Sequence, residues 1–346
     1  MKENQMLACV IHGAHDLRVE SVPEQPIGPG DAEVEIAVGG ICGSDLSYFL
    51  KGAVGDFVVR EPMVLGHEIV GTVARVGSDV DPKLVCQRVA VNPGKPCGVC
   101  GPCRAGRSNV CEDVFFLGSA ARFPHVQGGF RERLVIGAQQ LVALPDRLPF
   151  ESAVFSEPLA VSNHAVHRAG DVRDQSVLVV GAGPVGALVT LVARHRGCND
   201  VTVADLRDGA LETARRVGAT RTVNISGGTE ELGSAQVVFE ASGSPAGLAT
   251  ALQSVVRGGI VVQVGLLPTG PVSVPGNLIV TKDVDVRGSF RFSAAEFEEA
   301  VDMLAQGLDV APLVTARMDI GIAGEAFKLA SDRAASVKVQ LTFGDR

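Results

Sequence analysis

A glycine-rich turn between an apolar run and a helical segment restricts the fold of this chain more than any other feature. The run Ser176-Val-Leu-Val-Val-Gly181 is rich in β-branched residues and is typical of a strand buried in a parallel sheet. Gly181-Ala-Gly-Pro-Val-Gly186 follows and opens a stretch, 184–196, with helical periodicity. A G-x-G-x-x-G turn between a strand and a helix is typical of dinucleotide binding.

The three glycines of this turn have separate expected roles. Gly181 makes the tight turn, Gly183 lets the backbone approach a pyrophosphate, and Gly186 lets the helix and strand pack closely. The helix that begins at Pro184 and Val185 offers free N–H groups and a partial positive charge to the phosphates. These residues are therefore predicted to bind the cofactor.

The expected cofactor is NAD. Asp205 lies 19 residues beyond Gly186 (205 − 186), at the end of the second expected strand, where a carboxylate accepts hydrogen bonds from both ribose hydroxyls and repels a 2′-phosphate. Arg207 weakens this preference because it can partly neutralise such a phosphate, so NADP stays open. The structural alternative for Asp205 is a helix N-cap, but Asp208 is the better-placed cap.

The pattern of elements changes near residue 150. Before it, short alternating runs and a Pro/Gly-rich connection at 26–30 predict a small, mostly β barrel or sandwich. After it, strands and helices alternate at the spacing of a doubly wound parallel sheet. We expect strands at 176–181, 201–204, 236–240, 260–264 and 284–287, helices at 151–168, 184–196, 208–217, 246–256 and 294–305, and a last β segment at 337–343 that returns to the first domain.

Length and charge restrict the domain count and the partners. A chain of 346 residues suggests two domains, which we expect at 1–153 with 293–346 and at 154–292. The formal charge is 31 − 39 = −8 without a basic cluster, which argues against nucleic acid or an anionic membrane as a partner. No apolar run approaches the roughly 18 residues that span a bilayer, and the N-terminus has no signal-peptide core, so we expect a cytoplasmic protein.

Four of the eight cysteines, Cys97, Cys100, Cys103 and Cys111, fall within 15 residues (111 − 97 + 1). In a cytosolic chain such thiols are metal ligands more often than disulfides. Their spacing lets a lobe over 94–112 wrap one tetrahedral zinc ion at ~2.3 Å per Zn–S bond. Four protein ligands leave no open position, so this zinc is expected to be structural. An iron–sulfur cluster is the alternative, but nothing else in the sequence indicates electron transfer.

A second candidate metal site lies in the stretch Gly40–Glu68. Cys42, His67 and Glu68 supply a thiol, an imidazole and a carboxylate, the side chains of zinc sites that activate water or polarise carbonyls. A glycine stands beside Cys42 and another beside His67, so the backbone is expected to pack closely there. The structural alternative is a buried free cysteine and a core histidine.

Together these features resemble the zinc-dependent medium-chain dehydrogenases, in their polyol dehydrogenase branch, over essentially the whole chain. Two further stretches narrow the resemblance to the idonate type, which interconverts L-idonate and 5-keto-D-gluconate. The resemblance implies a GroES-like, mostly β catalytic domain and a Rossmann domain that binds NAD(P). The shared stretches are Gly39-Gly-Ile-Cys-Gly-Ser-Asp45, Pro62-Met-Val-Leu-Gly-His-Glu68 and Ser156-Glu-Pro-Leu-Ala160, and the narrowing ones are Phe115–Val126 and Gly288–Phe292.

By this resemblance Cys42, His67 and Glu68 match catalytic-zinc positions, and Glu157 matches a carboxylate that binds the metal or holds its water. Which glutamate is the ligand stays open. Alcohol dehydrogenases of this superfamily carry a second cysteine in place of Glu157, and a carboxylate makes the ion harder, which suits a polyhydroxylated substrate. The structural alternative for Glu157 is a first-turn acid in a helix with Pro158 at N1.

The other catalytic positions also follow from the resemblance. Ser44 matches the hydroxyl that takes the first proton from the substrate, whereas Ser47 stands where relatives commonly carry a histidine, which leaves the exit of the proton unassigned. Arg291 matches a substrate-side arginine and is the candidate cation for the carboxylate of a sugar acid. Tyr48 matches a pocket position, with simple packing as its alternative. Further cofactor contacts are expected at Ser242, Val264, Gly265, Ser289 and Phe290.

The resemblance implies an enzyme with about two zinc ions per chain, one catalytic and one structural, that moves a hydride between a sugar acid or polyol and a nicotinamide. A sibling that acts on sorbitol, xylitol, another aldonate or L-threonine is the first alternative. A non-catalytic cofactor-binding protein on the same fold is the second. Relatives are dimers or tetramers, so a homodimer or homotetramer is expected, in which strand 284–287 is a candidate to extend a sheet across the subunit edge.

Overall fold

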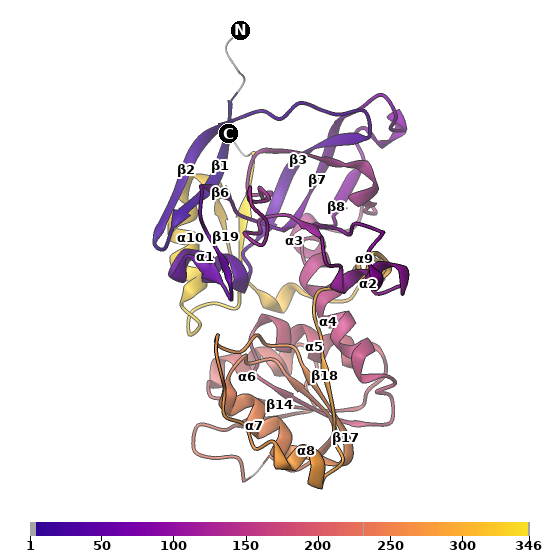
Figure 1. Cartoon of the computed structure of the whole chain (residues 1–346), viewed down its shortest axis with the longest axis vertical. Coiled ribbons are helices and arrows are strands. Elements are labelled where there is room, and N and C mark those ends of the chain that lie inside the picture. The colour runs from indigo at the N-terminus through magenta and orange to yellow at the C-terminus, as the bar shows by residue number, and fades with distance from the viewer. Residues whose placement is uncertain (1–4, 231, 345–346) are drawn as a thin grey trace. The chain divides into compact units, whose positions relative to one another are not determined.

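The computed structural model describes residues 5–230 and 232–344, and its internal contacts divide the chain into two compact units (Figure 1). Unit 1 comprises Met1–Glu157 and Phe297–Arg346, and unit 2 comprises Pro158–Glu296. Each join lies four residues beyond the boundary expected from the sequence (157 − 153 and 296 − 292). Unit 1 therefore combines the two ends of the chain.

Unit 1 is organised around a seven-stranded sheet with the order β12-β8-β7-β3-β20-β19, in which β11 also pairs with β3. One edge of β3 pairs antiparallel with β7, and the other edge pairs first with β11 and then, at its last residues, with β20. The C-terminal strand therefore lies beside the end of β3, next to the residues that lead into Cys42. The strands are β3 (Asp31–Gly40), β7 (Glu68–Val76), β8 (Arg88–Val91), β11 (Arg133–Gly137), β12 (Leu141–Ala143), β19 (Val314–Asp319) and β20 (Lys338–Thr342).

Smaller elements complete unit 1. A three-stranded sheet has the order β2-β1-β6, and two hairpins pair β4 with β5 and β9 with β10. These strands are β1 (Gln5–Gly13), β2 (Asp16–Pro23), β4 (Ala53–Val54), β5 (Phe57–Val58), β6 (Met63–Val64), β9 (Gly94–Lys95) and β10 (Phe115–Phe116). The helices are α1 (Gly43–Lys51), α2 (Gly101–Arg104), α3 (Phe150–Ala153) and α10 (Ala323–Ser331), with 3₁₀ turns at Pro82–Leu84, Ser108–Val110, Ala138–Gln140, Ala311–Leu313 and Ile320–Ile322.

The core of unit 1 fixes α1 against the sheet. Phe327 of α10 meets Phe49 of α1 edge-on at 5.6 Å between ring centroids and Phe130 at 6.4 Å. Edge-to-face pairs of this kind contribute about 0.5–1.5 kcal/mol each beyond their area burial. All three rings are buried, so the helix that follows Cys42 is held by packing from a helix near the C-terminus.

Unit 2 contains a six-stranded, all-parallel sheet with the order β15-β14-β13-β16-β17-β18. The predicted doubly wound parallel sheet is thereby confirmed. Its strands are β13 (Ser176–Val180), β14 (Asp200–Asp205), β15 (Arg221–Asn224), β16 (Ala235–Glu240), β17 (Val255–Gln263) and β18 (Asp285–Gly288). The helices are α4 (Ser156–Ala169) and α9 (Ala294–Ala305), which run through the joins, and α5 (Pro184–His195), α6 (Asp208–Arg216), α7 (Pro245–Ser254) and α8 (Asn277–Thr281).

Several elements were not expected from the sequence. No element is predicted from the sequence at α1, which is only nine residues long and begins with glycine, a poor helix former. The expected helix at 151–168 is two helices, α3 and α4, with a break between Ala153 and Ser156. Among the described residues, no helix is both long and apolar enough to cross a bilayer.

Candidate active site

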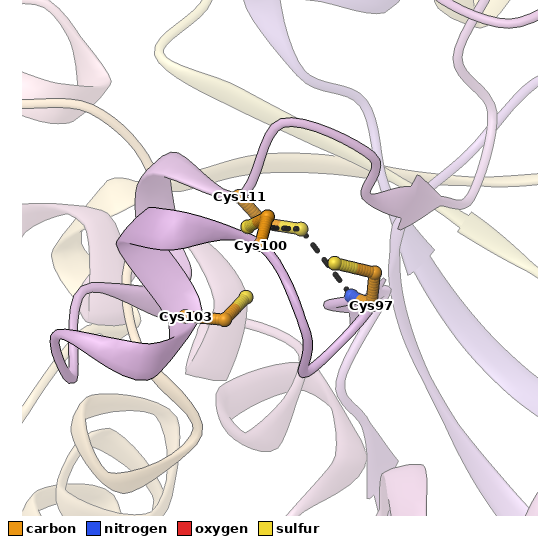
Figure 2. A group of neighbouring side chains, drawn as sticks. All are labelled: Cys97, Cys100, Cys103 and Cys111. Carbon is orange, nitrogen blue, oxygen red and sulfur yellow. Dashed lines mark hydrogen bonds between the residues drawn. The ribbon is translucent and has the colours of Figure 1, made fainter.

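The four clustered cysteines converge on one point of unit 1 (Figure 2). Their sulfur atoms all lie within 4.8 Å of one another. The Cys111 sulfur accepts hydrogen bonds from the Cys97 and Asp113 backbone N–H groups at 3.3 and 3.4 Å. Backbone bonds from Glu112 and Cys103 lower the pKa of the Cys100 thiol to about 7. Hydrogen bonds from backbone N–H groups stabilise the thiolate form of a cysteine, which is the form that binds metals. The four sulfurs together fit one tetrahedral metal ion.

The second group of potential ligands is assembled around Asp45, a buried acid in α1. Its Oδ2 accepts the Cys42 backbone N–H at 2.9 Å, and its Oδ1 accepts the Gly66 N–H at 3.3 Å. The same Oδ1 lies 3.8 Å from Nδ1 of His67. One carboxylate thus fixes the backbone on both sides of the site and orients the imidazole, a role common for residues behind metal ligands.

Backbone crowding around His67 has a clear cause, while crowding at Cys42 is absent. Gly66 has φ +97°, and a Cβ there would lie 2.2 Å from the Phe130 ring, so only glycine fits. A Cβ on Gly43 would meet no atom within 4 Å, so the space beside Cys42 is open, and the close approach of its backbone to a bound group stays a prediction. The His67 ring also packs against Phe116 at 5.7 Å between centroids.

Glu68 is engaged by a buried cation that sequence reasoning missed. Nζ of Lys338, at the start of β20, lies 2.6 and 2.5 Å from the two Glu68 carboxylate oxygens and donates to the Ile41 carbonyl at 3.0 Å. Both side chains are essentially inaccessible to solvent. Burial disfavours the charge on each partner, and the pairing opposes this effect, so that the pKa of Lys338 is raised. No local pattern relates Lys338 to Glu68.

Glu157 is the second buried carboxyl of the site. It is the second residue of α4 and is 5% exposed. Burial raises the pKa of Glu157 to about 8, the charge of His67 opposes this rise, and the charges of Glu68 and Cys42 add to it. Glu157 therefore lies close enough to interact with all three. Its place in the first turn also fits the structural alternative, and the two roles are compatible.

These residues fit a zinc ion. The ligand atoms of Cys42, His67 and Glu68 lie within 4.8 Å of one another. Glu157 is not part of that group, and burial raises the pKa of the Cys42 thiol to about 12 and that of Glu157 to about 8, so a metal ion would have to displace protons from both. A thiolate, an imidazole and one carboxylate leave an open coordination position, the pattern of catalytic zinc.

The predicted proton-relay residues lie on α1. Ser44 is hydrogen bonded to the Cys42 sulfur. The Ser47 hydroxyl donates to the Gly43 carbonyl at 3.0 Å, within the helix. Three histidines that could replace Ser47 at the end of the relay have other partners: His12 contacts Glu20 at 3.2 Å, His15 meets the Phe49 ring edge-on, and His164 contacts Glu296 at 2.8 Å.

The predicted pocket residues differ in their surroundings. The Tyr48 hydroxyl is buried and accepts the Ala120 N–H at 2.9 Å, so it fixes the 115–126 stretch to α1. That stretch contacts the site twice, through Tyr48 and through Phe116 on His67. Arg291 belongs to unit 2, where its guanidinium lies 4.7 Å from the Phe290 ring centroid and its φ is +54°. Its role toward a substrate remains a prediction.

The glycine turn of unit 2 has the geometry of a phosphate-binding turn. Gly181 has φ +101°, and a Cβ there would lie 2.7 Å from the Ser242 backbone nitrogen. A Cβ on Gly186 would lie 1.8 Å from the Gly181 carbonyl oxygen, so this glycine is required for packing. Gly183, the N-cap of α5, has no atom within 4 Å of that position. The turn is therefore closed on its protein side and open where a phosphate would approach.

The remaining predicted cofactor residues lie at the carboxyl ends of the parallel strands. Asp205 ends β14, and its carboxylate accepts the Ala182 N–H at 2.8 Å and the Arg207 N–H at 3.0 Å. Its Oδ1 also lies 3.3 Å from Nε of Arg207. The other predicted contacts follow β16, β17 and β18, at Ser242, Val264, Gly265, Ser289 and Phe290. Ligands of doubly wound sheets bind at this edge.

Comparison with known proteins agrees with this arrangement. Residues 28–146 match the alcohol dehydrogenase GroES-like domain, and residues 184–306 match the zinc-binding dehydrogenase domain. L-idonate 5-dehydrogenase (NAD(P)(+)) of Escherichia coli K12 is 37% identical over 344 residues, covering 97% of this chain and 98% of that protein. Sorbitol dehydrogenase of Bacillus subtilis is 36% identical over 319 residues, covering 90% of this chain and 89% of that protein.

Solved structures give the same result. The crystal structure of E. coli L-idonate 5-dehydrogenase superposes with a TM-score of 0.91 at 36% identity, covering 99% of both chains. That of rspB from E. coli CFT073, described as complexed with NADH, superposes with a TM-score of 0.88 at 29% identity, covering 98% of this chain and 99% of the other. The chain belongs to the zinc-binding medium-chain dehydrogenases, and it is an oxidoreductase of the alcohol and polyol dehydrogenase type. The predicted GroES-like and Rossmann domains are thereby confirmed.

Proposed function

We propose that this enzyme interconverts L-idonate and 5-keto-D-gluconate in the cytoplasm, with NAD as the preferred cofactor. The identity of 37% over nearly the full length of an L-idonate 5-dehydrogenase supports the substrate, as do the contacts of the 115–126 stretch with His67 and Tyr48. The ribose-binding position of Asp205 supports NAD.

The observation that carries the proposal is the convergence of Cys42, His67 and Glu68, whose ligand atoms lie within 4.8 Å of one another. Glu68 is also paired with Lys338 at 2.6 Å, and Glu157 is a further buried carboxyl whose pKa responds to Glu68, His67 and Cys42. In this account Cys42 and His67 bind the zinc, and Glu68 and Glu157 are the two carboxyls that bind it or hold its water. The open position accepts a hydroxyl of a sugar acid.

The residues of the chain itself hold the reacting groups in position. When bound, zinc acts as a Lewis acid that lowers the pKa of the substrate C5 hydroxyl. A nicotinamide dinucleotide held by the glycine turn at 181–186 would supply the acceptor for the hydride of C5. Asp45 keeps His67 oriented through its contact at 3.8 Å, and Phe116 covers one side of the imidazole. Ser44, bonded to the Cys42 sulfur, is placed to receive the proton of the substrate hydroxyl.

The carboxylate of L-idonate needs a cation, and Arg291 is our candidate. Its backbone has φ +54°, a conformation that a non-glycine residue adopts at an energetic cost and that recurs at functional sites. We expect Arg291→Ala to lower kcat/KM for L-idonate and to leave kcat/KM for sorbitol, which has no carboxylate, nearly unchanged. An unchanged kcat/KM for L-idonate would show that this role is wrong.

A sorbitol- or xylitol-type activity is the second candidate, favoured by 36% identity to sorbitol dehydrogenase of B. subtilis. L-Threonine is a third substrate of the same reaction class. We also propose a homodimer or homotetramer, because β18 pairs with β17 and is the last strand of its sheet. Light scattering on the purified enzyme measures that state.

The decisive experiment measures initial rates with 5-keto-D-gluconate and NADH or NADPH, and then with L-idonate, sorbitol, xylitol and L-threonine. We expect 5-keto-D-gluconate to be reduced faster with NADH, and the kcat/KM for L-idonate to exceed that for sorbitol by about tenfold or more, as for a site with a cation for the carboxylate. Faster oxidation of sorbitol would favour the second candidate. Absence of turnover on every secondary alcohol would contradict both.

A further inference from the structure

Glu240, the last residue of β16, is a buried acid outside the metal centres. It has no solvent exposure. Its Oε1 accepts the Ser242 N–H at 2.8 Å and the Gly243 N–H at 3.1 Å, and its Oε2 accepts the Gln263 amide at 2.6 Å. Every one of these neighbours is a donor, as an ionised carboxylate requires. Among the described residues, no lysine, arginine or histidine is paired with it.

The same residue joins two segments that are expected to bind the cofactor. Its side chain holds Ser242 and Gly243 after β16, and its backbone carbonyl accepts the N–H groups of Val264 and Gly265 after β17, both at 2.9 Å. Gln263 extends the connection, because its amide donates to Glu240 and to the Gly265 carbonyl at 2.6 Å each.

Close packing makes this network rigid. A Cβ on Gly265 would lie 2.2 Å from the Gly243 backbone nitrogen and 2.9 Å from Oε2 of Glu240. A Cβ on Gly181 would lie only 2.7 Å from the Ser242 nitrogen, so the phosphate-binding turn packs against the same segment. A change at Glu240 is therefore transmitted to the ends of three adjacent strands.

The sheet order assigns this edge to one half of the dinucleotide. The strand order reverses between β13 and β16, and Asp205, the ribose ligand of the adenosine half, lies beyond β14 on the other side. The nicotinamide half then lies over β16 to β18, where Glu240 is. The oxidised nicotinamide ring carries a positive charge that the reduced ring lacks, so a fixed negative charge on this side favours the oxidised form.

We propose that Glu240 is a positioning residue for the nicotinamide half of the cofactor, and that its buried charge makes the enzyme bind NAD⁺ more tightly, relative to NADH, than it otherwise would. This rests on the proposed binding of NAD by unit 2. The glycine turn at 181–186 holds the phosphates, and Glu240 would hold the segments after β16 and β17 in the shape that binds the nicotinamide half.

The test compares dissociation constants for NAD⁺ and NADH, measured by calorimetry and by NADH fluorescence, in three variants of the full chain. Glu240→Gln keeps the size and removes the charge. Gln263→Leu removes one connection and keeps the charge. Glu212→Gln removes the charge of an exposed acid of unit 2 whose contact is with Arg215.

For Glu240→Gln we expect the dissociation constant for NAD⁺ to rise about tenfold and that for NADH about threefold, as for the loss of charge-assisted hydrogen bonds. For Gln263→Leu both should rise by the same factor, about threefold, which leaves their ratio unchanged. Glu212→Gln should match the wild type.

Equal changes for NAD⁺ and NADH in Glu240→Gln, or changes below about twofold in both, would overturn the proposal. If circular dichroism shows that Glu240→Gln is unfolded, Gln263→Leu decides, and wild-type affinity in that variant would overturn the positioning role. A wild-type enzyme that binds neither NAD⁺ nor NADH would instead contradict the proposed function, so the two failures are distinct.

Discussion

The two metal-ligand groups of unit 1 differ in how they are built. The cysteine lobe takes its four thiols from 97–111 and leaves three of them partly exposed. The second group takes Cys42 from the start of α1 and His67 and Glu68 from the point where β7 begins, and its charged neighbours Asp45 and Lys338 are buried. The lobe needs only a metal to be complete, whereas the second site also needs the C-terminal strand.

Because of this difference, we expect the cysteine lobe to have a structural role and the second site to have a catalytic one. Four thiolates saturate a tetrahedral ion, so the lobe cannot accept a substrate oxygen. The second site offers a thiol, an imidazole and a carboxylate, and three ligands leave one position of a tetrahedral ion open. An enzyme can therefore contain two zinc ions of which only one reacts.

The largest expected effect is the loss of Glu157. Glu157→Ala should lower kcat/KM by about 10³-fold or more, because the open site loses its unpaired carboxylate. Steady-state kinetics with L-idonate measure this loss. Glu151→Ala is the control, since Glu151 is an acid six residues earlier (157 − 151) whose partner is Arg317. Full activity of Glu157→Ala would show that Glu68 alone serves the metal.

Removal of Lys338 should mainly affect stability. Lys338→Met leaves Glu68 buried without its cation, which costs about 3–5 kcal/mol of unfolding free energy. Urea titration measures the cost, and Lys328→Met, an exposed lysine of α10, is the matched control. The double variant Lys338→Met/Glu68→Gln should regain most of the loss. A single variant as stable as the wild type would contradict the pairing.

Loss of a ligand from the cysteine lobe should mainly affect local structure and leave the activity almost unchanged. Cys103→Ser removes one of four thiols, and we expect protease cleavage within 94–112 to accelerate while kcat falls by no more than about threefold, because this metal orders a local segment. Limited proteolysis with mass spectrometry locates the cuts. If activity were lost and the lobe stayed resistant, the roles assigned to the two groups would be reversed.

The smallest effect should come from Ser47. Its hydroxyl donates to Gly43 within α1, so Ser47→Ala should change kcat/KM by less than about twofold. Ser44→Ala, on the same helix, removes the hydroxyl that is bonded to the Cys42 sulfur and should cost about tenfold or more. Equal losses in the two variants would place Ser47 in the proton path.

The parts of the molecule that the sequence predicts well are local ones. The cysteine lobe and the strand–turn–helix at 176–196 each carry their signal within about 20 residues, so spacing alone identifies them. Lys338 could not be found in this way, because it meets Glu68 at a separation of 270 residues. Asp45 stands inside a recognised stretch, but its bonds to Cys42 and Gly66 depend on α1, a short helix that was not predicted.

Glu240 was missed for a related reason. An acid at the end of an apolar strand is read from sequence as a surface residue, whereas in the fold it gathers donors from β17 and from the segment after β16. In both units, the residues that complete a site are buried polar groups whose partners come from other strands.

The central claim, that unit 1 holds two independent metal ions of which only one is catalytic, is tested most directly by zinc content per chain. Mass spectrometry of the wild type, Cys42→Ser and Cys103→Ser should give about two, one and one zinc ions. Only the Cys42 variant should lose turnover as its zinc is lost. A single zinc in the wild type, or loss of both ions in either variant, would contradict the account.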